Sequence, residues 1–511
     1  MHTPKTVVFG LDGAHFELIT PWVESGELPN VRRVLSEGIS GDLESVLPPV
    51  TSPNWKAYAT GKNPGKLGIF WWENIDTDEQ RVSYPSHRKH IHEAYWDHIG
   101  RKESAGVLGV PTTHPASPVN GFLVSGAPDG ENRNYAYPPS VEAELNEQFD
   151  YRVTKRHQLK DQRDAAVEEI LALIDQRFEA AKHLCQEFEP AFLQVTTFYI
   201  NSLHHYLWDD DATLEAWRIV DQHLGDYLDN ETNIVLMSDH GSTEIETVFN
   251  INTWLAEQGY LELDNQLSRG LLSLGINRDR IGKVAGTLNL RNFAAEHTPQ
   301  WVLDHLPASD GTVNRESKMR NVHWDESVAL ASGQGPVYLL LNRDDERYNR
   351  LRDEIRTQLE SLTDTRGRSV VETVHDREDV YHGQYLDEAP DLIIEQADGV
   401  HISGAVGHEE IFTTTDATGW QAENKLHGLF AAHGPSFTTG QVADLSILDL
   451  APTLLHLHGL PVPSDMDGEV RIDVFDGESA ASQRTVERRT MDRQSAELGR
   501  IRDVAQSLDG F

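Results

Sequence analysis

Short apolar runs alternate with amphipathic helical patterns along this chain, and this alternation restricts its fold more than any other feature. Strand-like runs lie at Thr6–Leu11, Gly106–Val110, Gly121–Ser125, Ala191–Ile200, Ile234–Met237, Val337–Leu341 and Gly428–Gly434. Helical patterns lie at Leu28–Gly38, Asp164–Phe188, Ala212–Leu228 and Leu445–Leu460. Such alternation predicts an α/β fold with a doubly wound, mainly parallel sheet and helices on both faces.

The charge balance limits the partners of the chain. It carries 44 Lys and Arg against 82 Asp and Glu, a net charge of −38. This charge repels nucleic acid and anionic membranes, so we expect neither as a partner. A folded acidic chain in which lysine is scarce also suggests adaptation to high salt, where screening shortens to about 3 Å at 1 M. An ordinary acidic mesophilic enzyme is the alternative.

The location of the protein is predicted from two missing signals. The start of the chain lacks the apolar region of a signal peptide, and no stretch reaches the ~18 apolar residues of a membrane span. We therefore expect a cytoplasmic protein. Its single cysteine, Cys185, excludes an internal disulfide and a cysteine metal site, and its helical surroundings indicate a small core residue. The oligomeric state is left open.

Polar residues follow three of the expected strands. Asp12 follows the first, Asn201 and His205 follow Ala191–Ile200, and Asp239 with His240 follow Ile234–Met237. The carboxyl ends of parallel strands meet at one edge of a sheet, where ligands bind. Carboxylates and imidazoles gathered there suit a divalent cation. An Asp-Gly turn at Asp12 and a structural histidine are the alternatives.

A candidate nucleophile lies in the segment TSPNWKAYAT. Thr51 or Ser52 followed by Pro53 resembles a helix N-cap with proline in the first turn, which predicts a helix over Asn54–Thr60. Backbone N–H groups and the helix dipole favour an anion such as phosphate at that end. A cation bound beside the hydroxyl would prepare it for attack.

Several stretches together resemble the type I phosphodiesterase/nucleotide pyrophosphatase family of the alkaline phosphatase superfamily. In chain order they are VVFGLDGAHFELI, LPPVTSPNWKAYATGKNPGKLGIF, YINSLHHYLW, VLMSDHG, GLFAAHGP and LDLAPTLLHLHGLPVPSDMDGE, between Lys5 and Val470. The resemblance implies an alkaline-phosphatase-like domain over residues 1–475 with a covering insertion at about 255–335. A polar, helical or flexible tail would follow at 476–511.

The resemblance also implies a chemistry. Enzymes of this family hydrolyse small phosphate esters through a covalent phospho-enzyme, with two divalent metals, often zinc or manganese, beside a Thr or Ser. By position, Asp12, Asp239 and His240 match one metal site, and Thr51 matches the nucleophile that the metal contacts. His205 matches a ligand of the other site and is a candidate for positioning water or protonating the leaving group.

The second metal site departs from the family pattern. Asn201 and Asn424 stand where the family has Asp and His, so this site is expected to be weak or absent. Lys425 lies beside the gap and is expected to supply positive charge, as a lysine does in single-metal sulfatases. Asn54 and Asn74 are candidate substrate-binding residues; Asn74 lies near the place where some relatives have an oxyanion-stabilising Asn.

We therefore expect a metal-dependent phosphodiesterase, with three alternatives. A transferase to a sugar or lipid acceptor would share the first half-reaction. A sulfatase-like hydrolase would need a Cys or Ser that is oxidised to formylglycine, which Thr51 cannot supply. Asn201 and Asn424 suggest the third alternative, a binding protein with a decayed second metal site, but the presence of Thr51, Asp12, Asp239 and His240 together argues against it.

Overall fold

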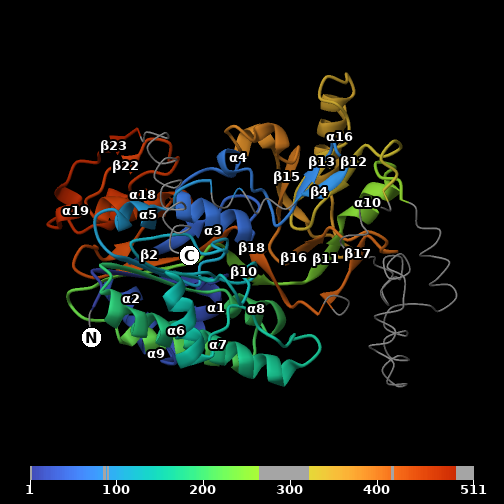
Figure 1. Ribbon diagram of the computed structural model, residues 1–511. Coiled ribbons are helices and arrows are strands. Elements are labelled where there is room, and N and C mark those ends of the chain that lie inside the picture. Colours follow the sequence, from blue (N-terminus) through green and yellow to red (C-terminus); the bar gives the residue numbers. More distant parts are fainter. Residues whose placement is uncertain (1–2, 84–87, 89–90, 264–321, 416–418, 491–511) are drawn as a thin grey trace.

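A computed structural model describes residues 3–83, 88, 91–263, 322–415 and 419–490. The α/β prediction is confirmed, because a mainly parallel sheet lies between two helical layers (Figure 1). The core of the predicted insertion, residues 264–321, lies outside the described residues. The domain boundaries stay a prediction. Among the described residues, no helix is long and apolar enough to cross a bilayer.

Within the described residues the central sheet has ten strands in the order β20-β2-β19-β9-β1-β8-β5-β6-β7, and β21 also pairs with β2. The strands are β1 (Thr6–Leu11), β2 (Ile39–Glu44), β5 (Ala105–Leu108), β6 (Gly121–Val124), β7 (Ala136–Tyr137), β8 (Phe192–Thr197), β9 (Asn233–Met237), β19 (His427–His433), β20 (Gly440–Gln441) and β21 (Leu445–Ser446). The strands from β9 to β6 run parallel, and β1 lies between β8 and β9. The ends of β1, β8 and β9 therefore share one edge.

Successive residues of β1 pack into different hydrophobic cores. Val7, Phe9 and Leu11 join one core, and Val8 joins the other. One layer contains α1 (Phe16–Ser25), α2 (Pro29–Glu37), α6 (Pro139–Phe149), α7 (Arg163–Phe188), α8 (Tyr199–Tyr206) and α9 (Asp211–Gly225). The other contains α3 (Thr51–Thr60), α5 (Tyr95–Gly100) and α18 (Leu450–Leu457). Burial of both faces explains why these strands read as continuous apolar runs.

A second body of strands lies beside the main sheet (Figure 1) and has its own core, which includes Phe249, Trp254 and Tyr338. It consists of the sheet β12-β13-β15-β14, the sheet β16-β11-β17, and two helices. Their bounds are β11 (Thr247–Asn250), α10 (Ile251–Glu257), β12 (Ala329–Ala331), β13 (Pro336–Leu339), α16 (Tyr348–Glu360), β14 (Val371–Asp376), β15 (Leu392–Gln396), β16 (Val400–Ser403) and β17 (Phe412–Thr413).

The remaining elements are short. The most important pair is β10 (Gly241–Glu244) with β18 (Ala422–Lys425), which are antiparallel and place Asn424 opposite Ser242. The others are α4 (Pro64–Leu67), β3 (Asn74–Asp76), β4 (Arg81–Ser83), α17 (Arg377–Val380), η3 (Leu386–Glu388), η5 (Ile447–Asp449), β22 (Val462–Pro463), η6 (Ile472–Val474), α19 (Ala480–Gln483) and β23 (Arg488–Arg489). Because β10 follows β9 directly, this pairing brings β18 next to the end of β9.

Two predicted elements have a different secondary structure over part of their length. The expected strand Ala191–Ile200 ends at Thr197, and Tyr199–Tyr206 form α8 instead, because Ile200 and Leu203 are spaced to enter the helical core together. The expected helix Leu445–Leu460 begins as a strand and a short 3₁₀ turn that Ser446 caps, and α18 starts only at Leu450. His205 is consequently a helical residue, one turn after Asn201.

Candidate active site

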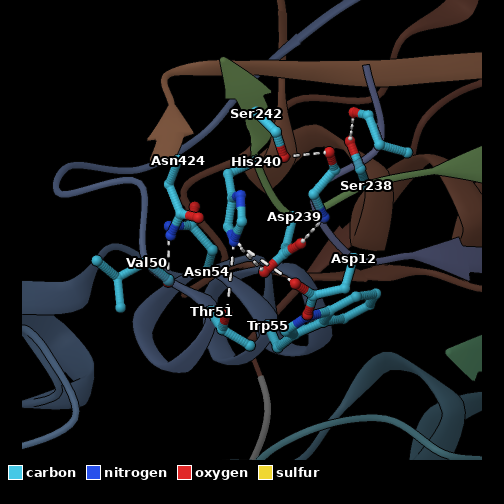
Figure 2. Close-up of polar contacts among 12 residues, drawn as sticks. Asp12, Val50, Thr51, Asn54, Trp55, Ser238, Asp239, His240, Ser242 and Asn424 are labelled. Atoms are coloured by element: carbon cyan, nitrogen blue, oxygen red, sulfur yellow. Dashed lines mark hydrogen bonds and ion pairs between the residues drawn. The ribbon is translucent and has the colours of Figure 1, made fainter. Parts of the chain in front are cut away.

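Asp12, Asp239 and His240 meet at the shared end of β1 and β9 (Figure 2). Their potential ligand atoms all lie within 4.8 Å of one another, and all three side chains are completely buried. Two carboxylates and an imidazole are costly to bury without compensation. The structure therefore gathers the three residues that the sequence pattern assigns to one metal site.

Each carboxylate of this cluster has one partnered and one unpartnered oxygen. Asp12 Oδ2 accepts a hydrogen bond from Trp55 Nε1 at 2.8 Å, and Asp239 Oδ1 accepts one from the Gly13 N–H at 3.3 Å. The remaining oxygens, Asp12 Oδ1 and Asp239 Oδ2, are buried without a hydrogen-bond partner. They lie 3.6 Å and 3.3 Å from His240 Nε2. Unpartnered buried oxygens around a common point fit a cation.

The tautomer of His240 supports the same conclusion. Its Nδ1 lies 2.9 Å from the Gly241 carbonyl, which only accepts, so Nδ1 holds the proton. Burial lowers the pKa of His240, which keeps the ring neutral. The Nε2 lone pair therefore faces the two carboxylates, and one nitrogen with two oxygens suits zinc or manganese.

Burial raises the pKa of Asp239 to about 8. Burial, reinforced by the neighbouring Asp239 carboxylate, also raises the pKa of Asp12 well above its usual range. Both shifts follow from placing negative charge in a site shielded from water. A bound cation would reverse them, because metal ligands bind in their deprotonated form.

Thr51 is the first residue of α3, and its side chain is 4% exposed. The expectation that Thr51 or Ser52 caps this helix is wrong, as is the expected helix start at Asn54. Val50 is the extended N-cap residue, and no side chain caps the helix. The Thr51 hydroxyl is thus not used as a cap, and Oγ1 lies 3.4 Å from His240 Nε2.

Asn54 holds the loop that precedes α3. Its Oδ1 accepts a hydrogen bond from the Val46 N–H at 2.7 Å, and its Nδ2 lies 3.0–3.1 Å from the carbonyls of Val46, Pro48 and Val50. The side-chain amide of Asn54, a candidate for substrate binding in the sequence, is therefore already hydrogen-bonded to backbone groups. A contact of Asn54 with substrate stays a prediction, whereas its support of the loop before Thr51 is visible.

Replacing Asn54 with Ala is expected to lower the free energy of unfolding by about 2–3 kcal/mol, because several backbone groups lose their partner. Denaturant unfolding measures this change. The neighbouring Ser52, whose hydroxyl is buried without a partner, provides a matched control, and Ser52→Ala should leave stability nearly unchanged. A raised KM for Asn54→Ala with unchanged stability would instead favour a substrate contact.

Two of the residues assigned to the second metal site lie beside the first cluster. The Asn201 side chain lies close enough to the Asp12 carboxylate to oppose the rise in the pKa of Asp12. The Oδ1 atoms of Asn201 and Asn424 are both buried without a partner. Figure 2 shows Asn424 close to His240 and Ser242.

His205 stands apart from the compact cluster. Its Nδ1 lies 2.7 Å from the Ala422 carbonyl, and its ring stacks on Trp420 with the centroids 4.1 Å apart. Burial lowers the pKa of His205 to about 4, so the ring is neutral. The carbonyl fixes the proton on Nδ1 and leaves Nε2 as an acceptor. Among the described ligand groups, the compact cluster comprises Asp12, Asp239 and His240 without His205.

Lys425 and Asn74 have other partners. Lys425 follows Asn424 on β18, so their side chains point to opposite faces of the strand. Its Nζ lies 3.2 Å from Glu17 Oε2. Asn74 donates to the Gly68 carbonyl at 2.9 Å and accepts from the Phe70 N–H at 3.4 Å, and so holds that turn closed. The catalytic role of Lys425 and the substrate-binding role of Asn74 stay predictions.

Sequence reasoning missed Trp55 and Glu423. Trp55 lies one helical turn after Thr51 and supplies the hydrogen bond to Asp12. Glu423 is completely buried, pairs with His401, and accepts from Gln334 Nε2 and the Asn424 N–H, both at 2.7 Å. The only sequence signal for Glu423 is its place directly before Asn424, in the segment ENKLHG at residues 423–428.

Comparisons with known proteins agree with this geometry. A family model described as type I phosphodiesterase / nucleotide pyrophosphatase matches residues 6–435. The fold is similar to phosphonoacetate hydrolase from Sinorhizobium meliloti 1021, solved in complex with phosphonoformate, with a TM-score of 0.52 and 14% identity. The alignment covers 88% of this chain and 94% of that one. No curated protein sequence matches the chain significantly.

Proposed function

This chain belongs to the type I phosphodiesterase/nucleotide pyrophosphatase family, and we propose that it is a phosphodiesterase whose nucleophile is Thr51. Family membership makes it a phosphoric ester hydrolase that acts on small phosphate esters, in a family that typically depends on divalent metals. The placement of Thr51 Oγ1, 3.4 Å from His240 Nε2 and at the start of α3, is the observation that supports the proposed nucleophile.

Asp12, Asp239 and His240 would hold the cation in this proposal. When bound, it would lower the pKa of the Thr51 hydroxyl and balance negative charge on the phosphate oxygens. The Nδ1 hydrogen bond to Gly241 holds the His240 ring, and Trp55 and Gly13 hold one oxygen of each carboxylate. These contacts fix the ligand orientation before a cation arrives.

Thr51 Oγ would attack phosphorus from the helix end, with the first N–H groups of α3 facing the phosphate oxygens. The alcohol group would leave, and water would then cleave the threonine phosphoester. His205 is proposed to accept a proton from that water at Nε2, or to take up the Thr51 proton there first and pass it to the leaving group, because the proton of its neutral ring is held on Nδ1 by the Ala422 carbonyl. Asn201 and Asn424 would make any second cation site weak, because amides are poorer ligands than carboxylate and imidazole.

Turnover of bis(p-nitrophenyl) phosphate in molar KCl tests this function. We expect activity with Mn²⁺ or Zn²⁺ and none after chelation. Addition of an acceptor alcohol distinguishes hydrolysis from transfer, because a transferase would accelerate. Failure of both metals to support turnover would contradict the proposal and favour a binding protein.

The proposed role of Lys425 gives a separate prediction. Its partner Glu17 is 70% exposed, so their ion pair is weak and leaves the amine available. If the amine supplies positive charge to the reaction, Lys425→Met lowers turnover about a hundredfold, whereas Glu17→Gln leaves turnover unchanged. Steady-state kinetics of both variants measure this. Equal, small effects would identify Lys425 as a surface ion-pair partner only.

A further inference from the structure

A second group of potential metal ligands lies between α7 and α9, in the helical layer that Figure 1 shows beneath the central sheet. Asp175 and Glu179 come from α7, His223 comes from the last turn of α9, and Asp226 follows that helix. The chain then passes into the amino end of β9, whereas Asp239 follows the carboxyl end of β9. The two ligand groups are therefore at opposite ends of this strand.

His223 is the buried member of the group. Its side chain is 2% exposed, and its ring stacks on Phe178 with the centroids 4.8 Å apart. Nε2 lies 2.7 Å from Asp175 Oδ1, and a carboxylate only accepts, so Nε2 holds the proton. Asp175 therefore orients the ring in the manner of the carboxylates that support metal-binding histidines.

The other ring nitrogen of His223 has no hydrogen-bond partner although it is buried. Nδ1 faces Glu179 Oε1 at 3.7 Å and Asp226 Oδ2 at 3.8 Å, which is too far for a hydrogen bond. A lone pair that faces two carboxylate oxygens is electrostatically unfavourable unless a positive charge lies between them. For comparison, ligands about 2.1 Å from a tetrahedral ion are separated by about 3.4 Å.

A positive charge is already close to this position. The Lys182 amine lies 3.0 Å from Glu179 Oε1 and also contacts Asp226 Oδ2. One ammonium does not balance the three carboxylates of Asp175, Glu179 and Asp226, and it leaves His223 Nδ1 unpartnered. Lysine has a long, flexible stem, so its amine has room to turn toward solvent.

We propose that this group is a second, structural site for a divalent cation of the zinc class. His223 Nδ1, Glu179 and Asp226 are the ligands, Asp175 orients His223, and Lys182 occupies the site in the absence of the ion. The donor set of one imidazole and two carboxylates suits Zn²⁺. The ion links α7 to the end of α9 and thus stabilises the helical layer without contact with the reaction.

Zn²⁺ bound per chain, measured by equilibrium dialysis and elemental analysis, tests this site. Asp239→Asn is used as the background because it removes the ion of the active site. We expect this variant to retain an ion that Asp239→Asn/His223→Gln and Asp239→Asn/Glu179→Gln both lose. Zn²⁺ should also raise the melting temperature of the single variant and not of the double variants. Glu168→Gln changes an exposed carboxylate elsewhere on α7 and should change neither quantity.

The Zn²⁺ affinity of a Lys182 variant is a second test of this site. Lys182→Ala removes the competing ammonium, so Zn²⁺ affinity in the Asp239→Asn background should rise about tenfold, which corresponds to about 1.4 kcal/mol. His223→Gln should retain turnover, which also shows that it folds. Equal Zn²⁺ binding by the single and double variants would overturn the proposal. Unchanged or weaker binding by Lys182→Ala would show that the ammonium is the intended occupant, and would overturn it as well.

Discussion

Thr51→Ala is expected to reduce turnover of a phosphodiester by at least about 10⁴-fold, the scale seen when a covalent nucleophile is removed. The Thr51 hydroxyl lies at the Asp12–Asp239–His240 cluster, with Oγ1 3.4 Å from His240 Nε2. Alanine leaves α3 intact, because Val50 and not Thr51 is the residue at the N-cap. Steady-state kinetics with saturating Mn²⁺ or Zn²⁺ measure the loss.

Thr51→Ser is the matched control, because it retains the hydroxyl at the same position. We expect measurable turnover in this variant and, with substrate present, an increase in intact mass that corresponds to a phosphorylated chain. Thr51→Ala should show no such increase while it still binds the cation. If Thr51→Ala kept turnover within tenfold of the wild type, a residue other than Thr51 would be the nucleophile.

The cluster at the sheet edge was predictable because it depends on local sequence and one topological rule. Asp12 and Asp239 each follow a strand that is apolar throughout, and parallel strands bring their carboxyl ends together. His240 adds a second costly polar group directly after Asp239. Strands with such a clear apolar pattern can be predicted from local sequence, without knowledge of contacts between distant residues.

Other parts of the site depend on contacts that the local sequence does not contain. The residues Phe198–Ile200 favour a strand by composition, yet Tyr199 and Ile200 belong to α8 because the helical core accommodates them. The position of Asn424 near His240 arises from the pairing of β10 with β18, whose residues are about 180 apart in sequence. The support of Thr51 by Asn54 depends on a loop of prolines that only the folded chain shows.

The pKa values of the proposed metal ligands also depend on their surroundings in the folded chain, which the sequence does not predict. Asp12 and Asp239 are ordinary carboxylates in the sequence, and only complete burial and mutual repulsion raise their pKa values. The same burial leaves one oxygen of each without a partner. The cation site and the unusual protonation are thus two consequences of one arrangement.

Asp239→Asn is expected to reduce turnover by about 10³-fold, since a cation at such a site contributes several kcal/mol to the reaction. Asparagine retains the shape of the side chain and an oxygen that the Gly13 N–H can reach, but it removes the negative charge that would hold the ion. Chelation of the wild-type protein should cause a loss of similar size. Restoration by added Mn²⁺ or Zn²⁺ should occur for the chelated wild type and not for the variant.

The effect of chelation on stability should depend on pH. In the metal-free protein burial raises the pKa of Asp239 to about 8, against 3.8 for an ordinary Asp, so between these values the folded state binds more protons than the unfolded state. The free energy of unfolding of the metal-free protein therefore falls as pH rises from about 4 to about 8. Cation binding needs the deprotonated carboxylate and strengthens over the same range.

The difference in melting temperature with and without the cation should widen from pH 5 to pH 8, to about 3–5 °C at a cation concentration one hundred times the Kd. Asp239→Asn should show less widening, because it removes one of the two buried carboxylates whose pKa values are raised. A difference that stays constant with pH in the wild type would mean that Asp239 is not a ligand of the stabilising ion.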